Sequence, residues 1–184
     1  MAEIPFDWYA LIEANAALEQ GDILLNVPVF EPDIQVIDLA QHSGGERVSY
    51  EIDVKKYDLI IMTQSCDFLK LSESSGVICC VTSSYSDATQ QSDWNKGVKW
   101  SDLRKGNVVA LHLINKCDIE GHEFDYQIVN LREVITLPFG YLKNIAIANG
   151  DRIRLLPPYR EHLSQAFARL FMRVGLPIDL PEKP

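Results

Sequence analysis

The stretch YDLIIMTQSCDFL (residues 57–69) decides how the fold of this chain is predicted. Its apolar part, residues 59–62, is followed by the small or polar residues 63–67. A short apolar run with such a boundary is typical of a buried strand. The polar end would place a hydroxyl, an amide, a thiol and a carboxylate at one rim of a sheet. Because binding and catalytic residues concentrate on the loops and strand ends of rigid scaffolds, a functional site is expected at this rim.

Further strand patterns lie on both sides of this stretch, separated by turns and irregular segments rather than by regular helices. They cover residues 21–30, 47–54, 76–84, 107–114, 124–131, 132–138 and 151–156. Helical apolar spacing is found near the two ends, at residues 7–20 and 157–175, where Gly21 and Gly175 end the patterns. This arrangement predicts an α+β fold, with a small, strongly bent antiparallel β-barrel as the expected architecture.

The chain is expected to form a single domain over residues 1–184. Of its 184 residues 47% are apolar, enough for one core of common size. The prediction places an N-terminal helix in residues 1–20 and a barrel in residues 21–156, with an insertion at 85–105. A C-terminal helix at 157–175 and a tail at 176–184 complete it.

Two features of the sequence offer a surface for partners. Trp94 and Trp100 of the insertion could form a stacking platform for bases, or pin a long loop to the core. At 3.6 residues per turn, His162, Arg169 and Arg173 share one face of the predicted C-terminal helix, and Arg160 lies near its start. This cluster could bind phosphate or an acidic partner, or be a solvated helix face. Two more arginines precede it, Arg152 and Arg154.

Composition limits the classes of partner and cofactor. The formal net charge of −9 opposes a general electrostatic attraction to nucleic acid. No apolar run approaches the roughly 20 residues that span a bilayer, and the acidic N-terminus lacks the basic start of a signal peptide. The sequence therefore predicts a cytoplasmic protein with reduced cysteines and no membrane partner. No CxxC or HxxxH pair has zinc-ligand spacing, so neither a metal nor another cofactor is expected.

Several motifs occur in a recognisable order. Gly21-Asp22-Ile23 opens the first strand, residues 59–65 end in small polar residues, and residues 77–82 end in a threonine. YQIVNLREVITLPFGYL (residues 126–142) and a C-terminal helix follow. This order resembles the PemK/MazF family of toxin endoribonucleases, which have a small SH3-type barrel. The chain departs from the family at residues 55–58, where KKYD replaces an Arg-Pro pair.

The resemblance implies metal-independent cleavage of RNA in a toxin–antitoxin or phage-defence setting. RNA, an antitoxin or another protein, and a second copy of the chain are the partners it implies. The reaction needs a base for the ribose hydroxyl and cations for the phosphate. Thr82 matches the family's threonine. Lys55 or Lys56 would replace the missing arginine as a point charge, and Arg132 could supply a further cation.

Residues Gln64, Ser65, Cys66 and Asp67 allow other interpretations. Cys66 could be a nucleophile, with His162 or His112 as its base. Alternatively, Cys66 is a small buried residue and Asp67 caps the following turn. Gln64 and Ser65 are candidate binding residues at the same strand end.

Two functions therefore stay open at this point. The first is a diverged endoribonuclease of the PemK/MazF type. The second is a non-catalytic barrel that acts as a protein-interaction module. A single active centre would require that the curled sheet bring the polar segments around positions 65 and 82 to one concave surface.

Overall fold

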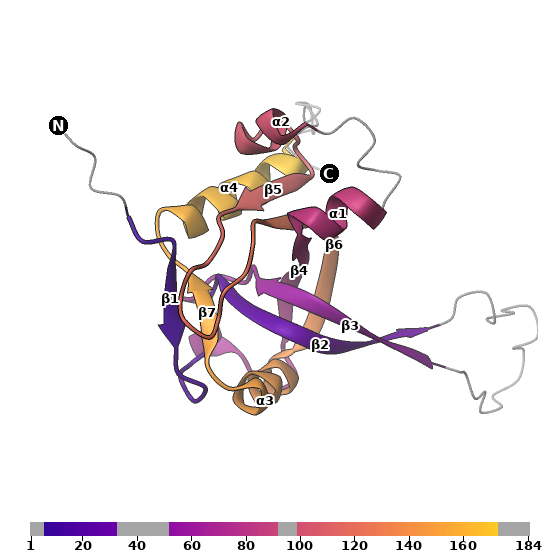
Figure 1. Ribbon diagram of the computed structural model, residues 1–184. Coiled ribbons are helices and arrows are strands. Elements are labelled where there is room, and N and C mark those ends of the chain that lie inside the picture. Colours follow the sequence, from indigo (N-terminus) through magenta and orange to yellow (C-terminus); the bar gives the residue numbers. More distant parts are fainter. Residues whose placement is uncertain (1–5, 33–51, 92–98, 173–184) are drawn as a thin grey trace, which may run out of the picture.

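The computed structural model describes residues 6–32, 52–91 and 99–172 as one antiparallel sheet with helices around it (Figure 1). The strands are β1 (Tyr9–Ile12), β2 (Asp22–Pro32), β3 (Ile52–Ile61), β4 (Gly76–Ser84), β5 (Leu111–Ile114), β6 (Gln127–Pro138) and β7 (Arg152–Leu155). The helices are α1 (Tyr85–Gln91), α2 (Trp100–Arg104), α3 (Phe139–Asn149) and α4 (Tyr159–Phe171), with a 3₁₀ turn, η3, at Phe68–Lys70. The strand order is β1-β7-β2-β3-β4-β6-β5, which confirms the predicted α+β antiparallel class.

The stretch that decided the prediction forms the end of β3, a central strand. Leu59, Ile60 and Ile61 are fully buried. Because successive side chains point to opposite faces, Ile60 joins the core on one face, and Leu59 and Ile61 join the core on the other. The two strands expected at residues 47–54 and 59–65 are one strand where the structure describes them. Lys55 and Lys56 continue the pairing of β3 with β2.

The sheet is bent, but the described strands do not close it into the expected barrel. β1 and β5 are the two edges, and no backbone pairing joins them within residues 6–32, 52–91 and 99–172. The edges nevertheless approach each other. The Tyr9 hydroxyl on β1 donates a hydrogen bond to the carbonyl oxygen of Asn115, just after β5. The Tyr9 ring also meets Phe124 edge to face, with 5.2 Å between ring centroids.

The N-terminal helix expected in residues 1–20 is wrong where the structure describes this segment. Residues 9–12 form β1, which pairs with β7 from Tyr9↔Leu155 to Ile12↔Arg152. Tyr9 is buried, whereas Leu11, two residues on and therefore on the same face, is 46% exposed, so the first residue of this edge strand lies on the core. The apolar spacing in this segment fits a helix as well as a strand. Pairing with β7, which is distant in sequence, decides between them.

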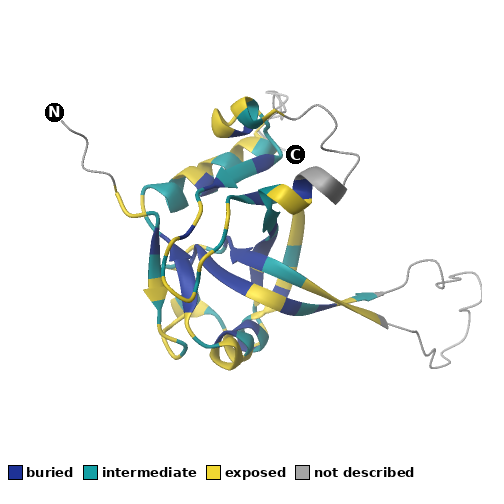
Figure 2. Cartoon of the chain, in the orientation of Figure 1, coloured by how far each residue is buried: buried dark blue, intermediate teal, exposed yellow. Residues whose placement is uncertain are grey.

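Two helices cover opposite faces of the sheet (Figure 2). Leu163 of α4 packs in the core that contains Tyr9, Ile60 and Ile153. α3 covers the other face, where its buried side chains Leu142 and Ala146 join a second core. The predicted C-terminal helix is thus confirmed as α4, although Gly175 and the tail lie outside the described residues. No helix in the described ranges is both long and apolar enough to cross a lipid bilayer.

The expected insertion at 85–105 contains α1 and α2, and packs against β5 and β6. Leu103 of α2 and Ala88 of α1 share a third core with Leu111. The Trp100 ring makes edge-to-face contacts with Tyr85 and Tyr126, with 4.9 and 4.8 Å between ring centroids. These contacts favour the alternative in which Trp100 pins the insertion to the core. Trp94 lies outside the described residues.

Candidate functional site

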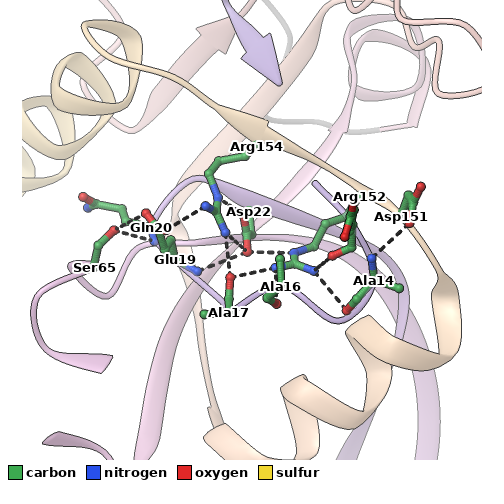
Figure 3. Close-up of polar contacts among 11 residues, drawn as sticks. Ala14, Ala16, Ala17, Glu19, Gln20, Asp22, Ser65, Asp151, Arg152 and Arg154 are labelled. Atoms are coloured by element: carbon green, nitrogen blue, oxygen red, sulfur yellow. Dashed lines mark hydrogen bonds and ion pairs between the residues drawn. The ribbon is translucent and has the colours of Figure 1, made fainter. Parts of the chain in front are cut away.

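A buried ionic cluster joins the start of β2 to β7 and to the loop between β1 and β2 (Figure 3). Asp22 is fully buried and accepts hydrogen bonds from Arg152 Nε at 2.8 Å and from Arg154 Nε. Arg154 Nη1 also lies 2.8 Å from Glu19 Oε1. Two carboxylates thus oppose two guanidiniums. Arg152 and Arg154 hold this structure together and are not part of a basic surface.

The Arg152 guanidinium also holds the loop between β1 and β2. Its Nη1 donates to the carbonyl oxygens of Glu13 and Ala14, and its Nη2 to those of Ala16 and Ala17, at 2.8–3.4 Å. Together with the bond to Asp22, these contacts use all five N–H donors of an arginine side chain. Arg152 therefore has no donor left for a ligand.

Next to this cluster lies a polar pocket of about 420 Å³, between the segment after β3 and the first turns of α4. Each residue that lines it is polar: Gln20, Gln64, Ser65, Cys66, Arg160, Glu161, Ser164 and Gln165. Four of these were candidates from the sequence, namely Gln64, Ser65, Cys66 and Arg160. The structure thus brings together two predicted clusters from distant parts of the chain.

Gln20 ties the walls of the polar pocket together. Its Nε2 donates to the carbonyl oxygen of Met62 and to Ser164 Oγ, each at 2.9 Å. Its backbone N–H donates to Ser65 Oγ at 3.2 Å. Ser164 Oγ in turn donates to the carbonyl oxygen of Arg160 at 3.0 Å. The segment after β3, the start of β2 and α4 are therefore held at fixed distances.

Arg160 and Glu161 place a charge pair at this pocket. Arg160 donates from Nε and Nη2 to Glu161 Oε1 at 3.1 and 2.8 Å. Burial raises the pKa of Glu161, but hydrogen bonding to the Arg160 guanidinium offsets this, and the pKa is lowered below its ordinary value. Glu161 Oε2 is buried and has no hydrogen-bond partner among the described residues. The pair therefore leaves an acceptor unused.

Gly21 makes room for the Arg160 side chain. Its backbone φ of +88° is in the region that favours glycine. A Cβ atom there would stand 2.7 Å from the carbonyl oxygen of Leu155 and 3.4 Å from Arg160 Cδ. The Gly21-Asp22 motif thus has a structural role. Gly21 leaves space for the Arg160 side chain, and Asp22 pairs with Arg152 and Arg154.

The Cys66 thiol is exposed, contrary to the expectation of a small buried residue. Its Sγ lies 3.9 Å from both Gln64 Oε1 and Asp67 Oδ1. Neither His112 nor His162 lines this pocket, so the expected nucleophile–base pair is not formed there. Asp67 occupies the position before η3, but its side chain does not cap the turn.

Thr82 lies in a different and larger cavity, which we call the Thr82 cavity. It measures about 530 Å³ and lies between β2, β3, β4, the loop before β6 and the end of α3. Thr82 is 4% exposed and donates to Gln127 Oε1 at 3.4 Å. Its cross-strand partner on β3 is Asp58, whose Oδ1 accepts the Asn26 N–H at 2.7 Å. Because Ser65 lines the polar pocket instead, the expected common surface for positions 65 and 82 is not formed.

The Thr82 cavity is acidic. Asp58, Glu123 and Asp151 line it, together with His122. Arg152 is the one Lys or Arg side chain among its described lining residues, and its donors are already used. The cavity can therefore accept positive charge far more easily than a phosphate.

The other predicted cations line neither pocket. Lys55 is exposed and pairs with Glu31, with 2.6 Å between Nζ and Oε2. The remaining ones are exposed at separate places on the surface: Lys56 on β3, Arg132 on β6, and His162 and Arg169 on α4. Arg173 lies outside the described residues. The phosphate-binding set expected from the resemblance is thus not assembled around Thr82.

Sequence reasoning missed Gln20, Asp58 and Glu161. Gln20 precedes the Gly21-Asp22 motif, and Glu161 follows Arg160, a predicted binding residue, so both lie next to residues that the sequence singles out. Their roles depend on contacts between distant segments, which leave no periodic signal. Models of known protein families give no match to this chain, and a comparison with curated proteins gives none either.

Proposed function

We propose that this chain is a non-catalytic interaction module whose Thr82 cavity receives a positively charged side chain of a protein partner. The charge of the cavity carries the proposal. Asp58, Glu123 and Asp151 line it, while the cation among the described lining residues, Arg152, is neutralised by buried Asp22. A cationic group entering the cavity would meet carboxylates without competing for an existing cation.

The walls of the cavity suit a side chain that is apolar along its stem. Ile23, Phe124 and Ala146 line it beside the carboxylates. Lysine and arginine combine an aliphatic stem with a charged head. The volume of about 530 Å³ is within the usual range of ligand pockets, about 300–1,000 Å³. A basic side chain therefore fits both the charge and the walls.

The test is a calorimetric titration with capped lysine and capped arginine, using capped norleucine as the neutral analogue. At least one basic probe is expected to bind, and norleucine about tenfold more weakly or not at all. Asp58→Asn should weaken that binding about tenfold, because one charge-assisted contact is lost. The asparagine keeps an oxygen that can accept the Asn26 N–H. Asp53→Asn, on the same strand but outside the cavity, is the matched control.

Equal binding of norleucine, or an unchanged affinity in Asp58→Asn, would contradict the proposal. Adenosine 5′-monophosphate provides the anionic comparison. Its preference over the basic probes would show that the cavity takes phosphate after all.

The second candidate is the metal-independent endoribonuclease of the PemK/MazF type, with the bent sheet as a diverged, incompletely closed SH3-type barrel. One observation favours it: Thr82 shares its cavity with Asp58 and His122, two groups able to exchange protons. The interaction-module proposal expects single-stranded RNA to stay intact in EDTA. Cleavage that is lost in Thr82→Ala would establish the nuclease instead.

A further inference from the structure

The outer halves of β2 and β3 have strand edges without a neighbour among the described residues. The two strands continue past the rest of the sheet as a two-stranded ribbon, residues 27–32 and 52–57, which we call the β2–β3 ribbon (Figure 1). In the described part of the chain, β4 pairs with β3 at positions 58–61, and β7 pairs with β2 at positions 22 and 23. Unpaired N–H and C=O groups on such edges can bind another strand.

The backbone of β2 is partly occupied by α3, whereas the edge of β3 is open. Tyr141 of α3 donates a hydrogen bond to the carbonyl oxygen of Pro28 at 2.6 Å, and proline has no N–H to offer. Asn149 Nδ2 donates to the carbonyl oxygen of Leu25 at 2.8 Å. On β3, residues 53–56 are exposed, and no hydrogen bond from described residues outside the ribbon reaches their backbone. The β3 edge is therefore the one that can take a further strand.

The two faces of the β2–β3 ribbon differ in character. Phe30 and Val54 are direct cross-strand partners, and they are 62% and 54% exposed, so one face carries an unprotected apolar pair. The other face is charged. Lys55 pairs with Glu31, with 2.6 Å between Nζ and Oε2, and Asp53 lies directly opposite Glu31. A strand added to the β3 edge would therefore lie beside Val54 on one face and beside Asp53 and Lys55 on the other.

We propose that the β3 edge pairs, antiparallel, with the β3 edge of a second copy of the chain, with the two-fold axis at Val54. Charge complementarity identifies this occupant. In this register Asp53 lies opposite the partner's Lys55, and Lys55 lies opposite the partner's Asp53, so two ion pairs flank the axis. An axis at Asp53 or at Lys55 would instead place like charges directly opposite each other, which is destabilising.

The same register joins the apolar residues of the two copies. Val54 lies opposite the partner's Val54, and the two copies of β2 become the outer strands of a four-stranded sheet, each carrying its Phe30. Because directly opposite residues share a face, these four side chains form one continuous apolar stripe. Both copies use the same surface, as a two-fold symmetric dimer requires. The paired segments are short, so the expected dissociation constant is in the micromolar range.

Sedimentation velocity of the full chain, from micromolar to millimolar concentration, tests the proposal. The wild type is expected to form a dimer. Asp53→Lys should weaken it at least tenfold, because each new lysine faces the partner's Lys55, and Lys55→Glu should weaken it similarly. A mixture of these two variants should restore a dimer, because every lysine then faces a carboxylate. Asp118→Lys, which makes the same change of charge outside the ribbon, should leave the dimer unchanged.

A chain that stays monomeric over this range would overturn the proposal. A dimer that persists in Asp53→Lys, or a mixture of the two variants that does not associate, would overturn it as well. Dissociation in Asp53→Lys leaves the binding of basic probes in the Thr82 cavity unchanged, because residues 53–56 do not line that cavity. The two proposals can therefore fail independently of each other.

Discussion

Replacing Asp22 with asparagine is expected to lower the free energy of unfolding by about 3–5 kcal/mol, the usual cost of removing one partner from a buried ion pair. Asp22 is fully buried, and its carboxylate bonds both Arg152 and Arg154. Asparagine preserves the shape but leaves Arg154 with Glu19 as its ion-pair partner and Arg152 with no carboxylate partner among the described residues. The total stability of a domain is typically about 5–15 kcal/mol, so this substitution would remove a large part of it.

Urea unfolding followed by circular dichroism measures the effect. Asp118→Asn is the matched control, because it removes one carboxylate from an exposed pair with Lys116. Exposed pairs contribute at most about 1 kcal/mol. If Asp22→Asn cost no more than Asp118→Asn, the buried cluster would not be a main source of stability.

A loss of stability between pH 6.5 and pH 4 is the second large effect, and it comes from His112. Burial, aided by the nearby His162 on α4, lowers the pKa of His112 from 6.5 to about 4. The unfolded chain therefore takes up this proton at higher pH than the folded chain does. Stability is complete above pH 6.5, falls as the pH drops toward 4, and then levels off. The loss of stability amounts to at most about 3.4 kcal/mol, at about 1.36 kcal/mol for each unit of pKa difference.

Urea unfolding at pH 7.5 and pH 4.5 tests this effect, with His112→Leu as the comparison. Carboxylates also titrate in this range, so the informative quantity is the difference in pH dependence between the two proteins. The wild type should lose more stability than His112→Leu. Parallel losses would show that His112 titrates at its ordinary pKa in the folded protein.

The sequence predicted the central strands and α4 because their signals are local. Leu59, Ile60 and Ile61 form a continuous apolar run, and continuous runs are typical of strands covered on both faces. The apolar stripe of α4 repeats at helical spacing, with prolines before it. β1 could not be separated from a helix in this way, since its pairing partner Leu155 lies far away in the chain.

The candidate site was predicted in part for the same reason. Gln64, Ser65 and Cys66 follow an apolar strand, which marks a rim, and Arg160 follows two prolines at the start of a helix. That these residues share a pocket depends on Gln20, whose contacts reach Met62 and Ser164. No pattern in a single sequence records such a contact between three separate segments.

The arginine contacts to residues 13–17 have a consequence for how the chain acquires its structure during synthesis. These carbonyl groups cannot form their hydrogen bonds until Arg152 has been synthesised, and Arg152 lies more than 130 positions later in the chain. Until then Asp22 has no guanidinium from β7 to pair with, and β1 has no strand beside it. Contacts between such distant segments form slowly. The N-terminal part of the sheet is therefore expected to assemble last, although it is translated first, and a nascent chain that stops before β7 should stay susceptible to proteases.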